Sequence, residues 1–241
     1  MDAKKTDILG LPVDCIDFNC VLDHIKYAID KRELINIITL NAEMTMLALE
    51  DKELADIILN SSLVIPDGVG VIWALRRKNV NVQRLAGIDL VNALFPHIQE
   101  NKYKLYFLGA DSSVVSTAAK NVQRQYPSLD ITGDHHGYFH TEEDENVANI
   151  IKEATPDILL VALGVPKQEK WIAKWQKFIN VPVCIGVGGT FDVLAGRVKR
   201  APSIIRRCNM EWLYRLYKEP WRLNRMQVLP KFVQAVMKEK N

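Results

Sequence analysis

The sequence predicts an α/β protein built on a mostly parallel sheet. Apolar segments rich in β-branched residues alternate with amphipathic segments of about 10–15 residues, a pattern typical of parallel strands joined by crossover helices. The segment 157–164 is almost entirely apolar, as expected of a strand that is buried on both faces. Glycines or short polar residues follow most of the predicted strands, as in doubly wound folds. We therefore expect a Rossmann-like, doubly wound sheet with a C-terminal amphipathic helical appendage.

The elements are expected in a regular order along the chain. Residues 8–16 surround a Gly-Leu-Pro turn and predict a short hairpin at the edge of the fold. The strands of the sheet are expected at 35–41, 63–66, 104–109, 130–139, 157–164 and 183–189. The helices around them are expected at 21–28, 43–59, 71–77, 89–99, 114–125, 141–154 and 166–175. We expect residues 1–196 to form the Rossmann-like core and residues 197–241 to form the appendage.

Composition and charge narrow the class of protein. The chain has 241 residues and a formal net charge of +2, but residues 200–241 hold ten Lys or Arg against three Glu. Such a basic segment usually meets an anion, which can be nucleic acid, lipid head groups or a phosphorylated substrate. No apolar run approaches the roughly 20 residues of a spanning helix, and the four cysteines lack the spacing of a zinc site. We expect a cytoplasmic protein with reduced thiols.

The stretch 63–70 carries the most informative local pattern. Three apolar residues end a predicted buried strand at Pro66, and Asp67 then stands on a tight turn in front of a helix. Gly68 and Gly70 allow the backbone to pass close to a ligand. One interpretation is that Asp67 caps the following helix. The other is a ligand-facing carboxylate, because open α/β sheets bind ligands at the carboxyl ends of their strands.

Other predicted strands end in the same way, with polar residues or glycines just past the carboxyl end. Besides Asp67, these residues are Thr39, Asn41, Gly109, Gln168, Gly188, Gly189 and Asp192. Parallel strands end at one edge of a sheet, so these residues should converge on one crevice where glycine N–H groups can meet phosphates. The alternative is that βα loops are rich in such residues even without a ligand. We expect a nucleotide-type site.

Several cofactor and metal signatures are missing. The third small residue of a G-x-G-x-x-G fingerprint is replaced by Trp73 in one candidate and by Phe191 in the other. The sequence has no P-loop motif, which argues against that type of ATP or GTP hydrolysis. His135 and His136 have no further ligand at a sensible spacing for a metal. We therefore expect neither a cofactor nor a metal.

The C-terminal segment has apolar residues at helical spacing with basic residues between them. Trp212 and Leu216 belong to the apolar set, and Arg215 lies between them. Pro220 ends this helix, and a last amphipathic piece runs over 232–237. One interpretation is a helical cap on the core. The charge favours the other, an interfacial element with apolar residues in lipid and basic residues on anionic head groups. The arginines can also close over a diphosphate in place of a metal.

The motifs resemble those of the WecG/TagA/CpsF glycosyltransferase family. They are Thr39-Leu-Asn41, Pro66-Asp67-Gly68, Arg84-x-x-Gly87-x-Asp89, Phe107-Leu-Gly109, Gly137-Tyr-Phe, Pro156-Asp-Ile-Leu, Gly164-x-Pro-Lys-Gln168-Glu169, Gly188-Gly-Thr-Phe-Asp192, Arg200-Ala-Pro202, Glu211-Trp-x-x-Arg215 and Glu219-Pro-x-Arg222. The resemblance covers nearly the whole chain. Within the family, the chain is most similar to the N-acetylmannosaminyltransferases of wall teichoic acid assembly.

This resemblance implies a reaction and roles for individual residues. A UDP-N-acetylmannosamine donor would pass its sugar, with inversion, to the 4-hydroxyl of GlcNAc on undecaprenyl diphosphate, which needs one base. The resemblance implies that Asp67 is this base and that Arg215, Arg222 and Arg225 neutralise the leaving UDP. The implied substrate-binding residues are Thr39, Asn41 and Gln168 for the sugar, Gly109, Gly188, Gly189 and Asp192 for UDP, and Arg84 from its motif.

The implied partners are the UDP-sugar donor, the lipid-linked GlcNAc acceptor and an anionic membrane surface. The basic tail would dock on the inner face of the membrane, nucleic acid is not expected, and the exposed apolar face suggests a homo-oligomer. Two alternatives stay open. A transferase of this family can use another donor such as UDP-N-acetylmannosaminuronic acid, for which Lys167 offers a basic partner. A nucleotide-sensing or scaffold protein would use the pocket without catalysis.

Overall fold

The core of the molecule is a six-stranded parallel sheet, which confirms the predicted fold class. The computed structural model describes residues 5–239 apart from 203, 206–209 and 219–226, and the side chain of Arg215 is also outside the description. In spatial order the strands are β4 (Leu63–Pro66), β3 (Ile35–Leu40), β8 (Val183–Gly186), β7 (Ile158–Ala162), β5 (Lys104–Gly109) and β6 (Asp130–His135). Every pair of neighbours in this sheet is parallel.

The strand order places a switch in direction near the centre of the sheet. The chain enters this sheet at β3, steps outward to β4, and then crosses to β5 and β6 on the other side. It finally returns through β7 to β8, which lies beside β3. In doubly wound folds, ligands bind outside the carboxyl ends of the strands at such a point. This topology therefore positions a site at the ends of β3 and β8.

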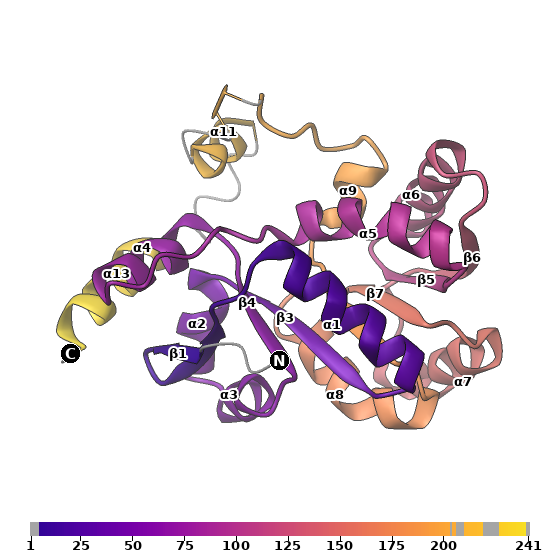
Figure 1. Cartoon of the computed structure of the whole chain (residues 1–241), viewed down its shortest axis with the longest axis horizontal. Helices are drawn as coiled ribbons and strands as arrows, with labels where there is room; N and C mark the ends of the chain where they lie inside the picture. The colour runs from indigo at the N-terminus through magenta and orange to yellow at the C-terminus, as the bar shows by residue number, and fades with distance from the viewer. Residues whose placement is uncertain (1–4, 203, 206–209, 219–226, 240–241) are drawn as a thin grey trace.

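Helices cover both faces of the sheet (Figure 1). One face packs against α1 (Phe18–Lys31), α5 (Gly87–Asn101), α6 (Ser112–Gln125) and α9 (Thr190–Leu194). The other face packs at one end against the hairpin β1 (Lys5–Ile8) and β2 (Leu11–Asp14) and against α2 (Ala42–Ala48), α3 (Lys52–Leu59) and α4 (Val69–Arg77). At its other end it packs against α7 (Asp144–Ala154), which follows the 3-10 turn Thr141–Glu143, and α8 (Lys167–Ile179).

Several element bounds differ from the sequence-based prediction: the strand expected at 183–189 ends at Gly186, and the hairpin expected at 8–16 spans 5–14. Two further elements differ more. The single helix expected at 43–59 is two helices, because the Asp51 side chain accepts a hydrogen bond from the Leu54 N–H and starts α3 there. The strand expected at 130–139 ends at His135, and residues 136–140 instead form a loop that reaches the pocket described below. The first of these two differences arises where a local polar contact competes with the apolar pattern.

The C-terminal part of the chain contains two further helices, α11 (Glu211–Lys218) and α13 (Val228–Lys238). The helix α13 packs beside α2 and α4, with Phe232 and Val236 buried among their apolar residues (Figure 1). Its end is fixed by Glu239, whose carboxylate accepts hydrogen bonds from the Leu9 N–H (2.9 Å) and the Lys78 ammonium (3.0 Å). Thus α13 packs on the core although it lies in the segment expected to form the appendage.

Candidate active site

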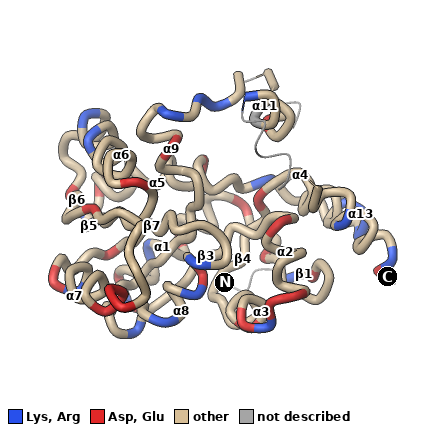
Figure 2. Tube along the Cα trace, turned by 180° about the vertical axis from the view of Figure 1, so that it is seen from behind, with Lys and Arg blue, Asp and Glu red and all other residues tan. Residues whose placement is uncertain are grey.

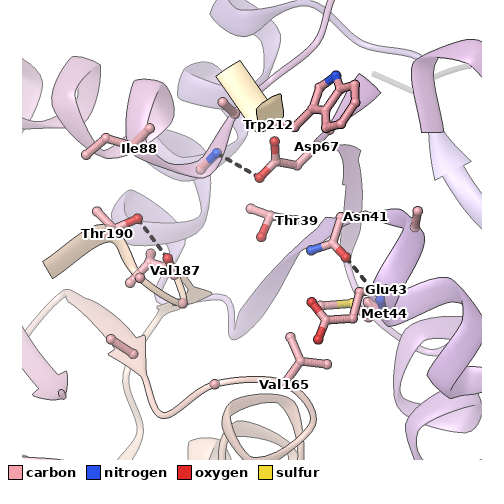
Figure 3. A pocket seen from close by; sticks show the side chains of 18 of the residues that line it. Thr39, Asn41, Glu43, Met44, Asp67, Ile88, Val165, Val187, Thr190 and Trp212 are labelled. Carbon is pink, nitrogen blue, oxygen red and sulfur yellow. Dashed lines mark hydrogen bonds between the residues drawn. The ribbon is translucent and has the colours of Figure 1, made fainter. Parts of the chain in front are cut away.

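A pocket of about 660 Å³ lies at the carboxyl ends of the central strands (Figure 3). The loops that follow β3, β4, β7 and β8 form its floor, and α11 and the start of α13 complete its walls. The predicted site residues that line it are Thr39, Asn41, Asp67, Arg84, Gln168, Gly188, Gly189 and Asp192. The structure therefore brings together most of the residues that sequence reasoning selected from separate strand ends.

Asp67 does not cap the helix that follows it. Gly68 is the N-cap residue of α4, with a φ of 84°, and no side chain caps this helix. The Asp67 carboxylate instead accepts a hydrogen bond, at 3.4 Å, from the N–H of Gly87, the first residue of α5. Its own N–H donates to the Leu40 carbonyl at 2.8 Å. The backbone thus holds a half-buried carboxylate that is directed into the pocket (Figure 3).

Thr39 and Asn41 occupy the end of β3, but each has a structural contact as well. The Thr39 hydroxyl donates to the Gly186 carbonyl at 3.2 Å and is largely buried. The Asn41 side-chain oxygen caps α2 by accepting from the Met44 N–H at 3.0 Å. The amide nitrogen of Asn41 points toward Thr39 and the inside of the pocket (Figure 3). Asn41 therefore offers a donor to a ligand while its oxygen holds the helix.

Gln168 lines the pocket from the first turn of α8 and is nearly buried, with 1% of its surface exposed. Its side-chain oxygen accepts from the Gly188 N–H at 3.1 Å, and its amide nitrogen donates to the Glu169 carboxylate at 2.7 Å. The protein therefore uses both ends of this amide. Burial raises the pKa of Glu169 to about 7, although the hydrogen bond from Gln168 lowers it. Sequence reasoning gave Glu169 no role of its own.

Gly109 is a glycine for a reason of packing. It has a φ of +125°, and a Cβ atom there would lie 2.3 Å from the carbonyl oxygen of Ala162 on the neighbouring strand. Gly109 does not line the pocket, whereas the next residue, Ala110, does. The sequence pattern therefore selected a loop that reaches the pocket through Ala110. The backbone that requires glycine at position 109 is that of Ala162 on β7.

An ion-pair network connects α11 to the start of α5. Arg84 donates to the Glu211 carboxylate at 3.0 Å, and the Arg200 side chain lies 3.5 Å from the other Glu211 oxygen. Arg200 also makes a two-pronged contact with Asp89, with the second hydrogen bond at 3.2 Å. We call Arg84, Asp89, Arg200 and Glu211 the clasp. Three separate sequence motifs meet in it, and it holds α11 over the pocket.

The tail arginines cannot be assigned from the described residues. Arg222 and Arg225 lie outside them, and Arg215 belongs to α11 although its side chain is not described. Their proposed contact with a diphosphate stays a prediction. On the same helix, Trp212 and Leu216 line the pocket. Their spacing of four residues places them on one helical face, which is a signal present in the sequence.

Sequence reasoning gave no site role to two other pocket residues, Glu43 and Tyr138. Glu43 is a half-buried carboxylate in the first turn of α2, and Tyr138 is a largely exposed side chain from the loop 136–140. Lys167, considered as a partner for an acidic sugar, instead lies with its amine 3.4 Å from the Gly137 carbonyl and 3.5 Å from that of Phe139. Lys167 therefore contacts the backbone of the loop 136–140, and it is not among the residues that line the pocket.

The described residues contain no group of three or more His, Cys, Asp or Glu side chains arranged to hold a metal ion. The ring nitrogen Nδ1 of His135 instead lies 2.8 Å from the backbone carbonyl of His136. Within the same part of the chain, no helix combines the length and apolarity that crossing a membrane requires.

A parallel doubly wound sheet with carboxylates, amides and glycine turns at its switch point is the arrangement of enzymes that bind nucleotide-type ligands. The model of the glycosyl transferase WecG/TagA/CpsF family matches residues 6–241, and the chain belongs to this family. The predicted family membership is therefore confirmed, and with it the prediction that the protein is a glycosyltransferase.

Similar proteins are known from several bacteria. A relative from Bacillus subtilis strain 168 is 38% identical over 89% of this chain and 83% of its own length. One from Bacillus spizizenii is 34% identical, covering 94% of this chain and 90% of the relative. One from Staphylococcus aureus strain MW2 is 35% identical, covering 99% and 94%. All three are named N-acetylglucosaminyldiphosphoundecaprenol N-acetyl-beta-D-mannosaminyltransferase.

Proposed function

We propose that this enzyme transfers N-acetylmannosamine from UDP-N-acetylmannosamine to the 4-hydroxyl of GlcNAc on undecaprenyl diphosphate, in wall teichoic acid linkage-unit synthesis. The observation that carries the proposal is the position of Asp67, a half-buried carboxylate held by backbone contacts in the pocket at the switch point. The names of the relatives support the choice of sugar and acceptor.

The reaction would proceed by one in-line displacement. Asp67 accepts the proton of the acceptor hydroxyl. The oxygen of that hydroxyl forms a bond to the anomeric carbon of the donor sugar, and the bond from this carbon to the UDP oxygen breaks. Inversion follows because no covalent intermediate forms. Thr39, Asn41 and Gln168 would bind the sugar, while Gly188, Gly189 and Asp192 would border UDP, with Ala110 facing the pocket in place of Gly109.

The leaving diphosphate needs positive charge. Arg84 lines the pocket, and Arg215, Arg222 and Arg225 belong to the C-terminal segment, whose described residues Trp212, Leu216, Val228 and Leu229 also line it. Arginine binds phosphate through two parallel hydrogen bonds, so these residues would stabilise UDP as it departs.

The acceptor lipid requires access to a membrane, and the C-terminal segment has suitable chemistry. Ile204, Leu213 and Tyr217 are exposed, with 73%, 41% and 79% of their surfaces accessible. Lys and Arg residues lie along the segment between α9 and α11 and on α13 (Figure 2). We propose that this surface docks on anionic lipid at the inner face of the membrane. Pairing of the same apolar face between two copies in solution is compatible with this proposal.

The test is transfer from UDP-N-acetylmannosamine to a short-chain lipid-diphosphate-GlcNAc, with EDTA present. We expect Asp67→Asn to lower kcat by at least about 10²-fold and to bind UDP as the wild type does. Glu43→Gln changes a second carboxylate of the pocket. Should Glu43→Gln abolish turnover while Asp67→Asn does not, the base is Glu43.

The donor is tested in the same assay. UDP-N-acetylmannosaminuronic acid is offered beside UDP-N-acetylmannosamine, and the products are separated by mass. We expect product from the neutral sugar, because Lys167 is engaged outside the pocket. A wild type that binds UDP but transfers neither sugar would refute the proposed reaction.

A further inference from the structure

Glu169 is a buried carboxylate that the proposed reaction does not use. It has 3% of its surface exposed, and it is not among the residues that line the pocket. One carboxylate oxygen accepts a hydrogen bond from the Gln168 amide nitrogen at 2.7 Å. The other end of that amide accepts from the Gly188 N–H at 3.1 Å. These three groups form a chain of contacts from the interior to the wall of the pocket.

The hydrogen-bonding rules of the three groups determine how Gln168 is turned. An ionised carboxylate can only accept hydrogen bonds, so the donor end of the Gln168 amide has to face Glu169. The acceptor end then faces Gly188, whose N–H needs an acceptor. Without a negative Glu169, the amide can rotate by half a turn and place its NH₂ group against the Gly188 N–H. The Gly188 N–H would then have no partner in Gln168.

The end of β8 is shaped to admit these side chains. A Cβ atom on Gly186 would lie 2.7 Å from the Gln168 amide nitrogen and 3.1 Å from the Glu169 carboxylate. The carbonyl of Gly186 also accepts the hydrogen bond from the Thr39 hydroxyl at 3.2 Å. Glu169 is therefore connected through Gln168 to Gly188 in the turn after β8. The same end of β8 contacts Thr39 at the end of β3.

We propose that Glu169 is a positioning residue, which fixes the Gly188–Gly189 turn of the UDP pocket by orienting Gln168. This inference rests on the proposed function, since it takes the ligand of the pocket to be a UDP-sugar. Glu169 itself does not touch the substrate. It acts through the Gln168 side chain and the Gly188 backbone N–H, which belong to residues that line the pocket.

The titration of Glu169 gives the proposal a measurable consequence. Burial raises the pKa of this carboxyl to about 7, so it is ionised at pH 8 and protonated at pH 5.5. Two lysines of α8 form ion pairs with carboxylates of its neighbours: Lys170 lies 2.8 Å from Asp51 and 2.7 Å from Glu53, and Lys174 lies 3.4 Å from Asp144. The Lys167 amine lies near the Gly137 and Phe139 carbonyls, at 3.4 and 3.5 Å. A protonated Glu169 can donate a hydrogen bond and no longer forces the orientation of Gln168.

The experiment is UDP binding by calorimetry at pH 8 and pH 5.5, with wild type and Glu169→Gln. The variant carries a neutral side chain of the same shape at both pH values. We expect it to bind UDP about fivefold to tenfold more weakly than the wild type at pH 8. At pH 5.5 we expect equal affinities, because Glu169 is then neutral in the wild type as well. The titration of UDP itself is common to both proteins and cancels in the comparison.

The matched control is Asp144→Asn, another buried carboxylate of the same helical layer, which should keep wild-type affinity at both pH values. If Glu169→Gln does not fold, Gln168→Met breaks the same chain of contacts at Gln168. The UDP affinity of Gln168→Met should then lack the part of its pH dependence, between pH 8 and pH 5.5, that Glu169 gives the wild type. Equal affinity of Glu169→Gln and wild type at pH 8, or the same loss at both pH values, would overturn the proposal. A wild type that does not bind UDP overturns the proposed function itself, whereas failed sugar transfer with normal UDP binding leaves this inference standing.

Discussion

Replacement of Phe232 by alanine tests whether α13 is part of the cooperative core. The Phe232 ring is completely buried, and a Cβ atom on Gly70 of α4 would already lie 3.5 Å from it. Removing such a ring leaves a cavity and typically costs about 3–5 kcal/mol. In a chain of this size we expect the melting temperature to fall by about 10 °C. Differential scanning calorimetry measures this shift.

The control is Val233→Ala on the same helix. Val233 is the adjacent apolar residue but has 36% of its surface exposed, so we expect a shift below about 3 °C. Limited proteolysis distinguishes a helix α13 that unfolds together with the core from one that detaches from the core on its own. A Phe232→Ala protein that melts like the wild type, while α13 is removed rapidly by trypsin, would show that the helix docks and undocks independently. The reasoning that joins α13 to the core would then be wrong.

Three further predictions concern a backbone glycine, the clasp and the pH dependence of stability. Gly109→Ala should lower the free energy of unfolding by at least about 3 kcal/mol, because a positive φ and a close backbone neighbour both oppose a side chain. Its control is Gly188→Ala, where φ is +51° and no atom lies within 4 Å of the new Cβ, and which should cost about 1 kcal/mol. Urea unfolding measures both changes. Glu211→Gln leaves the two arginines of the clasp facing a neutral side chain, so tryptic cleavage between α9 and α11 should accelerate at least about tenfold. The pKa of Glu169 is about 7 in the folded protein against 4.5 for an ordinary glutamate, so the folded protein binds this proton more tightly than the unfolded chain does. The free energy of unfolding of the wild type should therefore fall by about 3 kcal/mol as pH rises from about 4.5 to about 7. Glu169→Gln should lack this fall and be the more stable protein at pH 8, and urea titrations that show parallel pH profiles for both would contradict this.

The last of these predictions bears on function as well as stability. A charge kept in a buried position at neutral pH is unfavourable for folding, and Glu169→Gln should relieve that cost. The same change is expected to weaken UDP binding. A gain in stability together with a loss of binding is typical of residues retained for the site rather than for the fold.

The sequence was sufficient for the parts of the molecule that depend on local patterns. β-branched apolar runs and helical periodicity are properties of neighbouring residues, and they located the six strands of the sheet. The polar residues past the strand ends could be assigned to one pocket because parallel strands must end at the same edge. Thr39, Asn41 and Asp67 were predicted in this way, and they line the pocket.

The partners of those residues could not be predicted, because they come from distant parts of the chain. A local interpretation made Asp67 a possible cap of its own helix, while its carboxylate contacts Gly87, which the chain reaches only after α4. The glycine pattern indicated a phosphate contact at Gly109, while the neighbouring strand is what approaches it. Spacing alone does not show which backbone lies opposite a residue.

The sequence by itself determined the parallel α/β fold, the family and the edge of the sheet where the pocket lies, since each of these follows from residue type and short-range order. Only the tertiary structure decided that Arg84, Asp89, Arg200 and Glu211 form one clasp, that Phe232 belongs to the core, and that Glu169 orients Gln168. Those arrangements depend on chain crossings that bring residues more than a hundred positions apart into contact, or on the direction in which a buried side chain points. Neither property has a signature in the order of neighbouring residues.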